Sequence, residues 1–446
     1  MRDFTEGNIT KQMLLFSMPM LIGNLFQQLY SIVDAVVVGQ FVGGHALAAV
    51  GVSMNVTIFL TSMLIGLTMG SAVLIAQFFG AKQYDRLKKA VSVSVLFLAG
   101  LSVLLTVLGF VLAPQLLNLL DAPAEIFDYA LTYLRIVMAG MVFPIFFNMY
   151  TAYMRALGDA RRPLYILIAA SVFNMGLTLF FVAVLEWGVA GAAASTIISQ
   201  MGAAVLSYIY ARRTAPLLRV EKLMFEPEMF RAILRYGAPA ALQLSLVSFA
   251  GLTITRLINS FGSAAMAGIT AVSRIDQFAN MPVANLSMAL STFVAQNMGA
   301  GIEDRAKKGF RIALICMLIF SVLISAVLMI FSTPLISLFL DPTDANAEEI
   351  LSIGQSYLNI LVIFYFLFAF LFGFNGFFRG VGDAVIAMAF PVLSLTIRVV
   401  AAYALVYLAG MGPEALAWSI PIGWGLSSLA SWIYYKKRLW VGKVAV

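Results

Sequence analysis

The chain has 446 residues, of which 62% are hydrophobic and only 11% are charged, and its mean hydropathy is +0.95. Soluble domains carry roughly a quarter charged residues, so this composition excludes a soluble protein and predicts an all-α polytopic membrane protein. The net charge of +7 is explained by membrane topology, so no nucleic-acid partner is expected. A single cysteine, Cys316, and a single histidine, His45, exclude an internal disulfide and a histidine-cluster metal site.

Twelve apolar segments of about 20 residues or more follow one another along the chain. The first is too long for a signal-peptide core and has no small-residue cleavage site, so we expect it to be retained as a helix. The first six lie near 13–38, 46–79, 90–112, 127–150, 164–185 and 190–211, and the second six near 232–258, 266–297, 309–331, 350–374, 385–408 and 415–435.

Basic residues alternate between the connections. Those after the even-numbered segments, together with both termini, hold 24 of the 28 Lys and Arg residues, whereas those after the odd-numbered segments hold none. The positive-inside rule then places both termini in the cytoplasm, for a multi-pass protein of the plasma membrane. A miscounted segment would destroy this alternation, so the alternation supports the count of twelve.

The second half of the sequence repeats the first. AQFFGAKQYDRLKKAV at 76–91 matches AQNMGAGIEDRAKKGF at 295–310, and MRALGDA at 154–160 matches FRGVGDA at 378–384. We therefore predict two halves of six segments, 1–211 and 228–446, joined by a cytoplasmic linker at 212–227. Because six is an even number, both halves begin on the same side of the membrane and have the same orientation. Parallel repeats of this kind are typical of some secondary transporters.

No connection contains a GxxxxGK[ST] phosphate loop, and the loops are too short for a nucleotide-binding domain. Transport would then be driven by an ion gradient or be passive, with no cofactor other than the coupling ion. A membrane enzyme is the rival class, but the sequence lacks a paired-carboxylate motif and has one His and one Cys. The sequence therefore predicts a transporter and not an enzyme.

Two acids, Asp34 and Asp276, lie well inside apolar segments. Placing a carboxylate there costs on the order of 2.5–3.5 kcal/mol, so such residues usually have a function. Asp34 shares its segment with Pro19, which removes a backbone hydrogen bond and lets the helix bend. We expect Asp34 to bind a proton or a cation, although it could instead be a structural hydrogen-bonding group.

Asp276 lies two residues from Arg274, so the two side chains do not share a helix face. A structural network of Asp276 with Arg256 or Arg398 is the favoured interpretation. A second proton or substrate site that uses Asp276 and Arg274 is the alternative.

At 19–51 the sequence PMLIGNLFQQLYSIVDAVVVGQFVGGHALAAVG resembles the first two helices of the multidrug and toxic compound extrusion (MATE) transporters. The GDARRP and RGVGDA loops and the paired GAK/GAG…DR loops are also similar to that family, so the resemblance covers nearly the whole chain. It implies two six-helix lobes around a central cleft that opens alternately to either side. It also implies export of cationic or amphiphilic drugs in exchange for H⁺ or Na⁺. We expect the protein to contact membrane lipids and to work as a monomer.

The family's cation site in the first lobe carries over in part. The resemblance assigns its first-helix aspartate to Asp34, its asparagine to Asn174 and a threonine to Thr196, and its bend proline to Pro19. Two further polar residues, Tyr30 and Asn148, are expected to join this cluster.

This chain also departs from its relatives. Some have a second acid one turn after the asparagine, where this chain has Thr178, and others have acids in the seventh and tenth helices that are absent here. Arg398 stands at the repeat position of Asn174, and a positive charge there would repel a metal cation. We therefore expect coupling to belong to the first half.

Carboxylate, amide and hydroxyl oxygens of Asp34, Asn174 and Thr196 would suit Na⁺, whereas a proton would simply neutralise Asp34. The missing second acid favours H⁺. Either ion would change the polar contacts of the first helix, which would bend near Pro19 and release the drug outward. A flippase or an exporter of a lipid-linked or other endogenous metabolite is the alternative function, although twelve segments and Asp34 argue against it.

Overall fold

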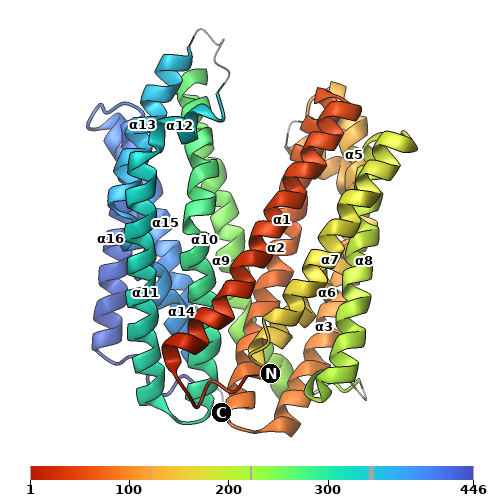
Figure 1. Cartoon of the computed structure of the whole chain (residues 1–446), viewed down its shortest axis with the longest axis vertical. Helices are drawn as coiled ribbons and strands as arrows, with labels where there is room; N and C mark the ends of the chain where they lie inside the picture. Colours follow the sequence, from red (N-terminus) through yellow and green to blue (C-terminus); the bar gives the residue numbers. More distant parts are fainter. Residues whose placement is uncertain (1, 121, 221–222, 341–345, 445–446) are drawn as a thin grey trace. The chain divides into compact units, whose positions relative to one another are not determined.

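The computed structural model describes residues 2–120, 122–220, 223–340 and 346–444, and nearly all of that part of the chain is helical (Figure 1). The helices of the first half are α1 (Ile9–Phe41), α2 (Gly44–Gly80), α3 (Tyr84–Val111), α4 (Ala113–Leu119), α5 (Ala124–Ala139), α6 (Val142–Ala156), α7 (Arg161–Thr178), the π-helix η1 (Leu179–Val184), α8 (Gly188–Thr214) and the 3₁₀-helix η2 (Pro216–Leu218). Those of the second half are α9 (Pro227–Asn259), α10 (Ser263–Gly299), α11 (Glu303–Ile330), α12 (Ser332–Ser337), α13 (Ala347–Ile363), α14 (Tyr365–Val381), α15 (Ala384–Tyr407) and α16 (Glu414–Lys436).

Each predicted segment coincides with one helix or with two consecutive helices, which confirms the all-α membrane fold. Within the described ranges, nine helices are long and apolar enough to cross a membrane, and up to 11 spans result if each of two bent pairs counts as one. The pairs are α5 with α6 and α13 with α14, bent by 51° and 52°. The 23-residue α16 corresponds to the twelfth predicted segment. Helices suit such apolar sequences because the membrane interior offers no water to hydrogen-bond the backbone.

Element lengths repeat between the two halves. Both α1 and α9 have 33 residues, both α2 and α10 have 37, and both α3 and α11 have 28. The turns after α6 and α14 each contain a left-handed glycine, Gly158 with φ of 78° and Gly382 with φ of 97°. A side chain would strain that backbone conformation, so the repeated GDA motif encodes a repeated turn.

By their internal contacts the residues form two compact units. Unit 1 comprises Met18–Ala241 with residues 2–4, and unit 2 comprises Leu242–Val444 with Thr5–Ser17. The boundaries therefore fall inside α1 and α9, beside Pro19 and Pro239, and not at the predicted linker 212–227. The division at 212–227 follows the sequence repeat and stays a prediction about that repeat.

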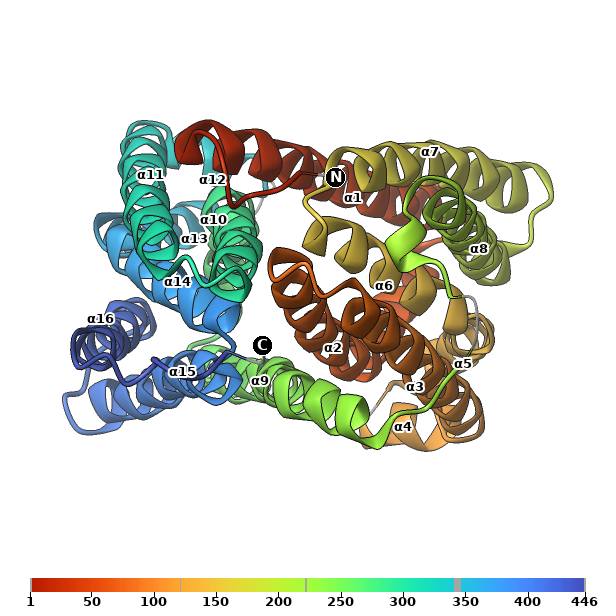
Figure 2. The same cartoon turned by 90° about the horizontal axis from the view of Figure 1, so that it is seen from below.

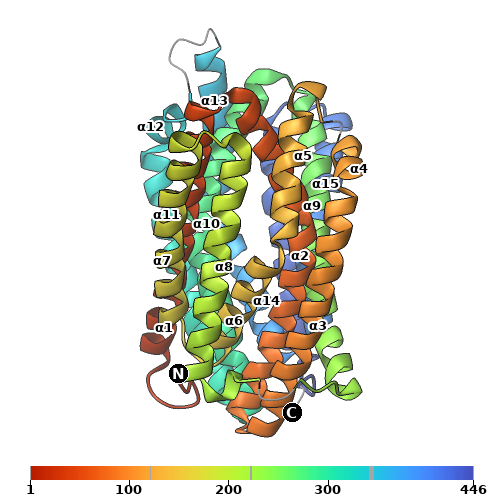
Figure 3. The same cartoon turned by 90° about the vertical axis from the view of Figure 1, so that its right-hand side faces the viewer.

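Within unit 1, α2 packs against α3, α5 and α6, and α8 packs against α5, α6 and α7; Figure 3 shows α2, α3 and α5 side by side. Within unit 2, α10 contacts α11, α13 and α14, as Figure 2 shows for α10, α11 and α14. The buried core of unit 2 includes Tyr357 and Tyr365 among its aliphatic side chains.

The first part of α9 belongs to unit 1 because glycines let it approach α2 closely. A Cβ atom added at Gly66 would lie 2.2 Å from the backbone nitrogen of Ala241. One added at Gly70 would lie 2.3 Å from the Cα of Gly237. Gly66 and Gly70 thus form a GxxxG motif, the pattern with which membrane helices bring their backbones together.

Candidate functional site

Asp34, on the part of α1 that belongs to unit 1, is held by hydrogen-bond donors from α7. The hydroxyl of Thr178 donates to Oδ1 of Asp34 over 2.8 Å. We orient the Asn174 amide with its nitrogen toward the carboxylate, since the opposite orientation would set oxygen against oxygen. In that orientation Nδ2 lies 3.2 Å from each oxygen of Asp34. Asn174 and Thr178 are four residues apart and therefore share one face of α7.

A second hydroxyl extends this contact to α8. The Oγ atoms of Thr178 and Ser195 lie 2.8 Å apart, and either can be the donor. Ser195 also lies 2.8 Å from the carbonyl oxygen of Ala192, to which it can donate. Both hydroxyl groups are fully buried. A row of hydrogen-bonding groups therefore runs from Asp34 through α7 to the backbone of α8.

Tyr30, Asn174 and Thr196 line one small cavity of unit 1. Tyr30 is close enough to Asp34 to interact with it electrostatically, as is Tyr133 of α5. The hydroxyl of Thr196 donates to the carbonyl oxygen of Ala192 over 3.0 Å, so its hydrogen bond stays within its own helix. The structure thus brings Asp34, Asn174 and Tyr30 together, with Thr196 at the edge of the group.

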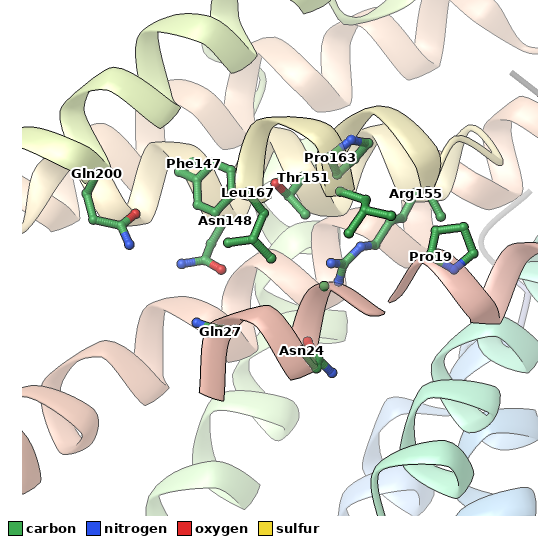
Figure 4. A pocket seen from close by; sticks show the side chains of 13 residues that line it. Pro19, Asn24, Gln27, Phe147, Asn148, Thr151, Arg155, Pro163, Leu167 and Gln200 are labelled. Atoms are coloured by element: carbon green, nitrogen blue, oxygen red, sulfur yellow. The ribbon is translucent and has the colours of Figure 1, made fainter. Parts of the chain in front are cut away.

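Pro19 and Asn148 line a different cavity of unit 1, which Figure 4 shows. The Asn148 side chain is exposed and donates to the carbonyl oxygen of Pro144 over 2.8 Å, and nothing joins it to Asp34. The two cavities are neighbours, because Phe147, Leu167 and Gln200 line both.

Asp276 of α10 lies in unit 2 among other donors. Tyr365 of α14 donates its hydroxyl to Oδ1 of Asp276 over 2.8 Å, and Asn280 donates its amide to the same atom over 2.7 Å. The guanidinium of Arg398 acts electrostatically on Asp276 and on Tyr357. Asp276 is therefore part of a polar network inside the unit 2 core.

The other arginines of the second half lie apart from this network. Arg274 and Arg256 have exposed side chains, and neither forms an ion pair with Asp276 in the described part of the chain. Of the arginines considered from the sequence, Arg398 interacts electrostatically with Asp276, and among the described residues no Lys or Arg lies within 4.0 Å of that carboxylate.

Several residues of the two clusters were not predicted as site members. Thr178 was noted only as the residue that replaces an acid, and Ser195, Tyr133, Tyr365 and Asn280 were not singled out. Helical spacing could have found two of them, since Thr178 follows Asn174 and Asn280 follows Asp276 by four residues. The others come from different helices, so spacing along the chain gave no signal for them.

Comparisons with known proteins identify the family. The MatE family model matches residues 19–180 and 239–404, once in each half of the chain. The probable multidrug resistance protein YpnP of Bacillus subtilis strain 168 is 30% identical over 440 residues, which cover 98% of this chain and 97% of that protein. The multidrug export protein MepA of Staphylococcus aureus strain NCTC 8325 is 27% identical over 329 residues, which cover 73% of this chain and 72% of that protein.

A solved structure agrees in fold. The outward-facing conformation of a multidrug resistance MATE family transporter of the MOP superfamily superimposes with a TM-score of 0.91 at 23% identity, covering 98% of this chain and 97% of the other. Because the family model covers most of the chain and the apolar helices match throughout, the chain belongs to the multidrug and toxic compound extrusion family of multi-pass membrane transporters.

Proposed function

We propose that this transporter exports cationic or amphiphilic drugs in exchange for protons, and that Asp34 is the group that takes up the proton. One observation carries the proposal. Asp34 faces Thr178 and Asn174, both neutral, and no Lys or Arg among the described residues lies within 4.0 Å of its carboxylate. A carboxylate inside a membrane helix without a basic partner is stabilised by a cation or a proton.

Drugs are proposed as substrates because the relatives YpnP and MepA are named as multidrug resistance and export proteins. A drug cation and a proton would both be attracted to the single negative charge of Asp34. Binding of one would therefore disfavour binding of the other, which is the condition for exchange. Both termini would face the cytoplasm, as the distribution of basic residues predicts.

The hydroxyl groups beside Asp34 suggest how a proton changes the site. A hydroxyl has one proton to donate and two lone pairs. When Asp34 is ionised, Thr178 donates to it and Ser195 can donate to Thr178. When Asp34 is protonated, it can donate to Thr178, which donates to Ser195, which in turn donates to the carbonyl oxygen of Ala192. Protonation would thus reverse a row of hydrogen bonds that joins α1, α7 and α8.

This reversal gives protonation a route to the backbone of α1. Pro19 lies inside α1 and leaves one backbone carbonyl without its usual partner, so the helix resists bending less there. We propose that the changed contacts of Asp34 favour a bend of α1 and release of the drug. Tyr30 would stay beside the carboxylate in both states.

Protons are proposed over sodium because of what faces the carboxylate. Na⁺ needs oxygen lone pairs, whereas the Thr178 hydroxyl donates its proton to Asp34 and the Thr196 hydroxyl donates to the Ala192 carbonyl. A sodium site on Asp34, Asn174 and Thr196 would require the Thr196 side chain to turn. The transporter is also proposed to act as a monomer.

The test uses the purified protein in sealed vesicles with a fluorescent organic cation inside or outside. Gradients of H⁺ and Na⁺ are imposed and collapsed separately with ionophores. Collapse of the H⁺ gradient should stop wild-type transport, and collapse of the Na⁺ gradient should not. The Asp34→Asn variant should transport no faster than vesicles without protein.

Asp128→Asn is the matched control, because Asp128 is an exposed acid of unit 1 and loses the same charge. It should keep wild-type coupling. Gradient-driven transport by Asp34→Asn at the control rate would refute the role of Asp34. Dependence on Na⁺ alone would refute proton coupling and leave Asp34 as a sodium ligand.

A further inference from the structure

Arg155, in the last turn of α6, has no partner for its charge among the residues that the structure describes. Its Nε atom is buried and makes no hydrogen bond. No carboxylate of the described residues lies within 4.0 Å of its guanidinium. A half-buried guanidinium whose Nε has no acceptor and which has no counter-charge is costly, so its retention calls for a partner outside the chain.

The Arg155 side chain lies on the cavity that also contains Pro19 and Asn148 (Figure 4). Two more side-chain atoms on this cavity lack a hydrogen-bond partner. They are Oγ1 of Thr151, a residue only 5% exposed, and Oε1 of Gln200. The cavity has a volume of about 50 Å³, enough for a few water-sized groups since each needs roughly 10–15 Å³.

The repeat supplies a comparison for this arginine. In the matching MRALGDA and FRGVGDA motifs, Arg155 of unit 1 corresponds to Arg379 of unit 2. Arg379 donates to the side-chain oxygen of Asn375, four residues earlier on α14. The residue that corresponds to Asn375 is Thr151, whose hydroxyl makes no such bond. Arg379 therefore has a hydrogen-bond acceptor within unit 2, whereas Arg155 of unit 1 has none among the described residues and lies on a cavity.

We propose that the cavity at Arg155 is a binding site for an oxyanion, a carboxylate or phosphate group of a small solute or of a lipid headgroup. The guanidinium presents parallel N–H donors that match two oxygens of such a group. The Thr151 hydroxyl adds a donor from one turn away on the same helix. The Gln200 oxygen accepts from a hydroxyl of a hydrogen phosphate or from a water that accompanies a carboxylate.

This site is separate from the one proposed for coupling. It borders α1 at Pro19, Gly23 and Gln27, and Gln27 precedes Asp34 by seven residues, or about 10 Å of helix. It shares Phe147, Leu167 and Gln200 with the cavity beside Asn174. An oxyanion at Arg155 would therefore lie next to the cavity beside Asn174, and its binding does not depend on proton coupling at Asp34.

The test measures binding to the whole protein. In the first arm, calorimetric titrations add inorganic phosphate or acetate to the protein in detergent, at an ionic strength held constant with chloride. In the second arm, the protein is placed in nanodiscs of phosphatidylcholine with or without phosphatidylglycerol, and the retained lipid is counted by mass spectrometry.

Two variants distinguish the site. Arg155→Gln removes the charge, and Thr151→Asn keeps the arginine but gives it the internal partner that Arg379 has. Each should weaken oxyanion binding at least tenfold, and Thr151→Asn keeps the test valid if Arg155→Gln does not fold. Arg161→Gln, which removes an exposed arginine at the start of α7, should leave binding unchanged.

Saturable binding of phosphate or acetate that both variants weaken supports a site for a soluble oxyanion. Retention of phosphatidylglycerol that both variants abolish, without phosphate binding, supports a lipid headgroup as the occupant. Binding in neither arm, or binding that Thr151→Asn leaves at the wild-type level, overturns the proposal.

Discussion

Asp34 in unit 1 and Asp276 in unit 2 both lie inside apolar helices, and each accepts hydrogen bonds from two side chains. The two sites differ in whether the neighbouring residue carries a charge. Asn174 stands beside Asp34, whereas the residue at its repeat position, Arg398, acts on Asp276. A neutral amide leaves a carboxylate free to exchange a proton, but the permanent charge of a nearby guanidinium favours the ionised carboxylate. The comparison shows how one fold, used twice, can keep one acid for transport and another for structure.

The largest effect is expected when Asn174 is replaced by the residue at its repeat position. Asn174→Arg would bring the charge of Arg398 to Asp34 while leaving the acid in place. We expect proton-driven drug transport in vesicles to fall to background, because the new cation would occupy the role of the proton. Asn174→Leu is the uncharged control and should retain more transport than the arginine variant. Full transport by Asn174→Arg would show that compensation of Asp34 is irrelevant.

Asp276 should matter for stability instead. Asp276→Asn removes the negative charge that interacts with Arg398 and that accepts the Tyr365 and Asn280 hydrogen bonds, each worth about 1.5–3 kcal/mol as a bond to a charged group. Thermal unfolding in detergent should show this loss, and a second change, Arg398→Met, should restore part of it. A double-mutant cycle measures the coupling between the two residues. If Asp276→Asn unfolds like the wild type but loses proton coupling, Asp276 is a second proton site.

The hydroxyl of Thr178 gives a smaller effect. Thr178→Val keeps the shape of the side chain and removes the donor to Asp34. Hydrogen bonds to charged groups are worth about 1.5–3 kcal/mol, or roughly ten- to hundredfold in a rate if the bond matters for the limiting step. Initial transport rates should fall by that order, and Thr178→Ser should retain most of the activity. Equal rates for the valine and serine variants would remove Thr178 from the mechanism.

The smallest expected effect is that of the next hydroxyl, Ser195. Ser195→Ala removes one neutral hydrogen bond, worth about 0.5–1.5 kcal/mol, so the transport rate should drop by roughly two- to tenfold. Thr196→Val is the neighbouring control, because Thr196 bonds only to its own helix. A larger loss for Thr196→Val than for Ser195→Ala would favour a sodium site that includes Thr196.

The sequence was sufficient to predict the helices but not the contacts between them. Apolar length and the alternation of basic connections locate every long helix, since both follow directly from the membrane as a solvent. Asp34 and Asp276 were identified because a carboxylate inside an apolar segment is costly in a membrane. The bends between α5 and α6 and between α13 and α14 were not predicted, because hydropathy continues across them.

The partners of each acid depend on packing that no local pattern records. Ser195 and Thr196 are adjacent in the sequence, yet only Ser195 reaches Thr178. Asn148 was expected to join the cluster of Asp34, but α6 places it on the cavity of Arg155. Arg155 itself was counted with the basic connections, because the sequence alone could not show that it turns back to a cavity.

The glycines between α2 and the first part of α9 have a consequence for how this protein tolerates change. In a lipid-facing helix most apolar residues can replace one another, because lipid chains do not distinguish them. Gly66 and Gly70 cannot be replaced in this way, since even one methyl group would collide with the facing backbone. A saturation survey of α2 should therefore find two of its least tolerant positions where no functional group exists. Intolerance to mutation in this transporter marks close packing as well as chemistry, and only the neighbouring atoms tell the two apart.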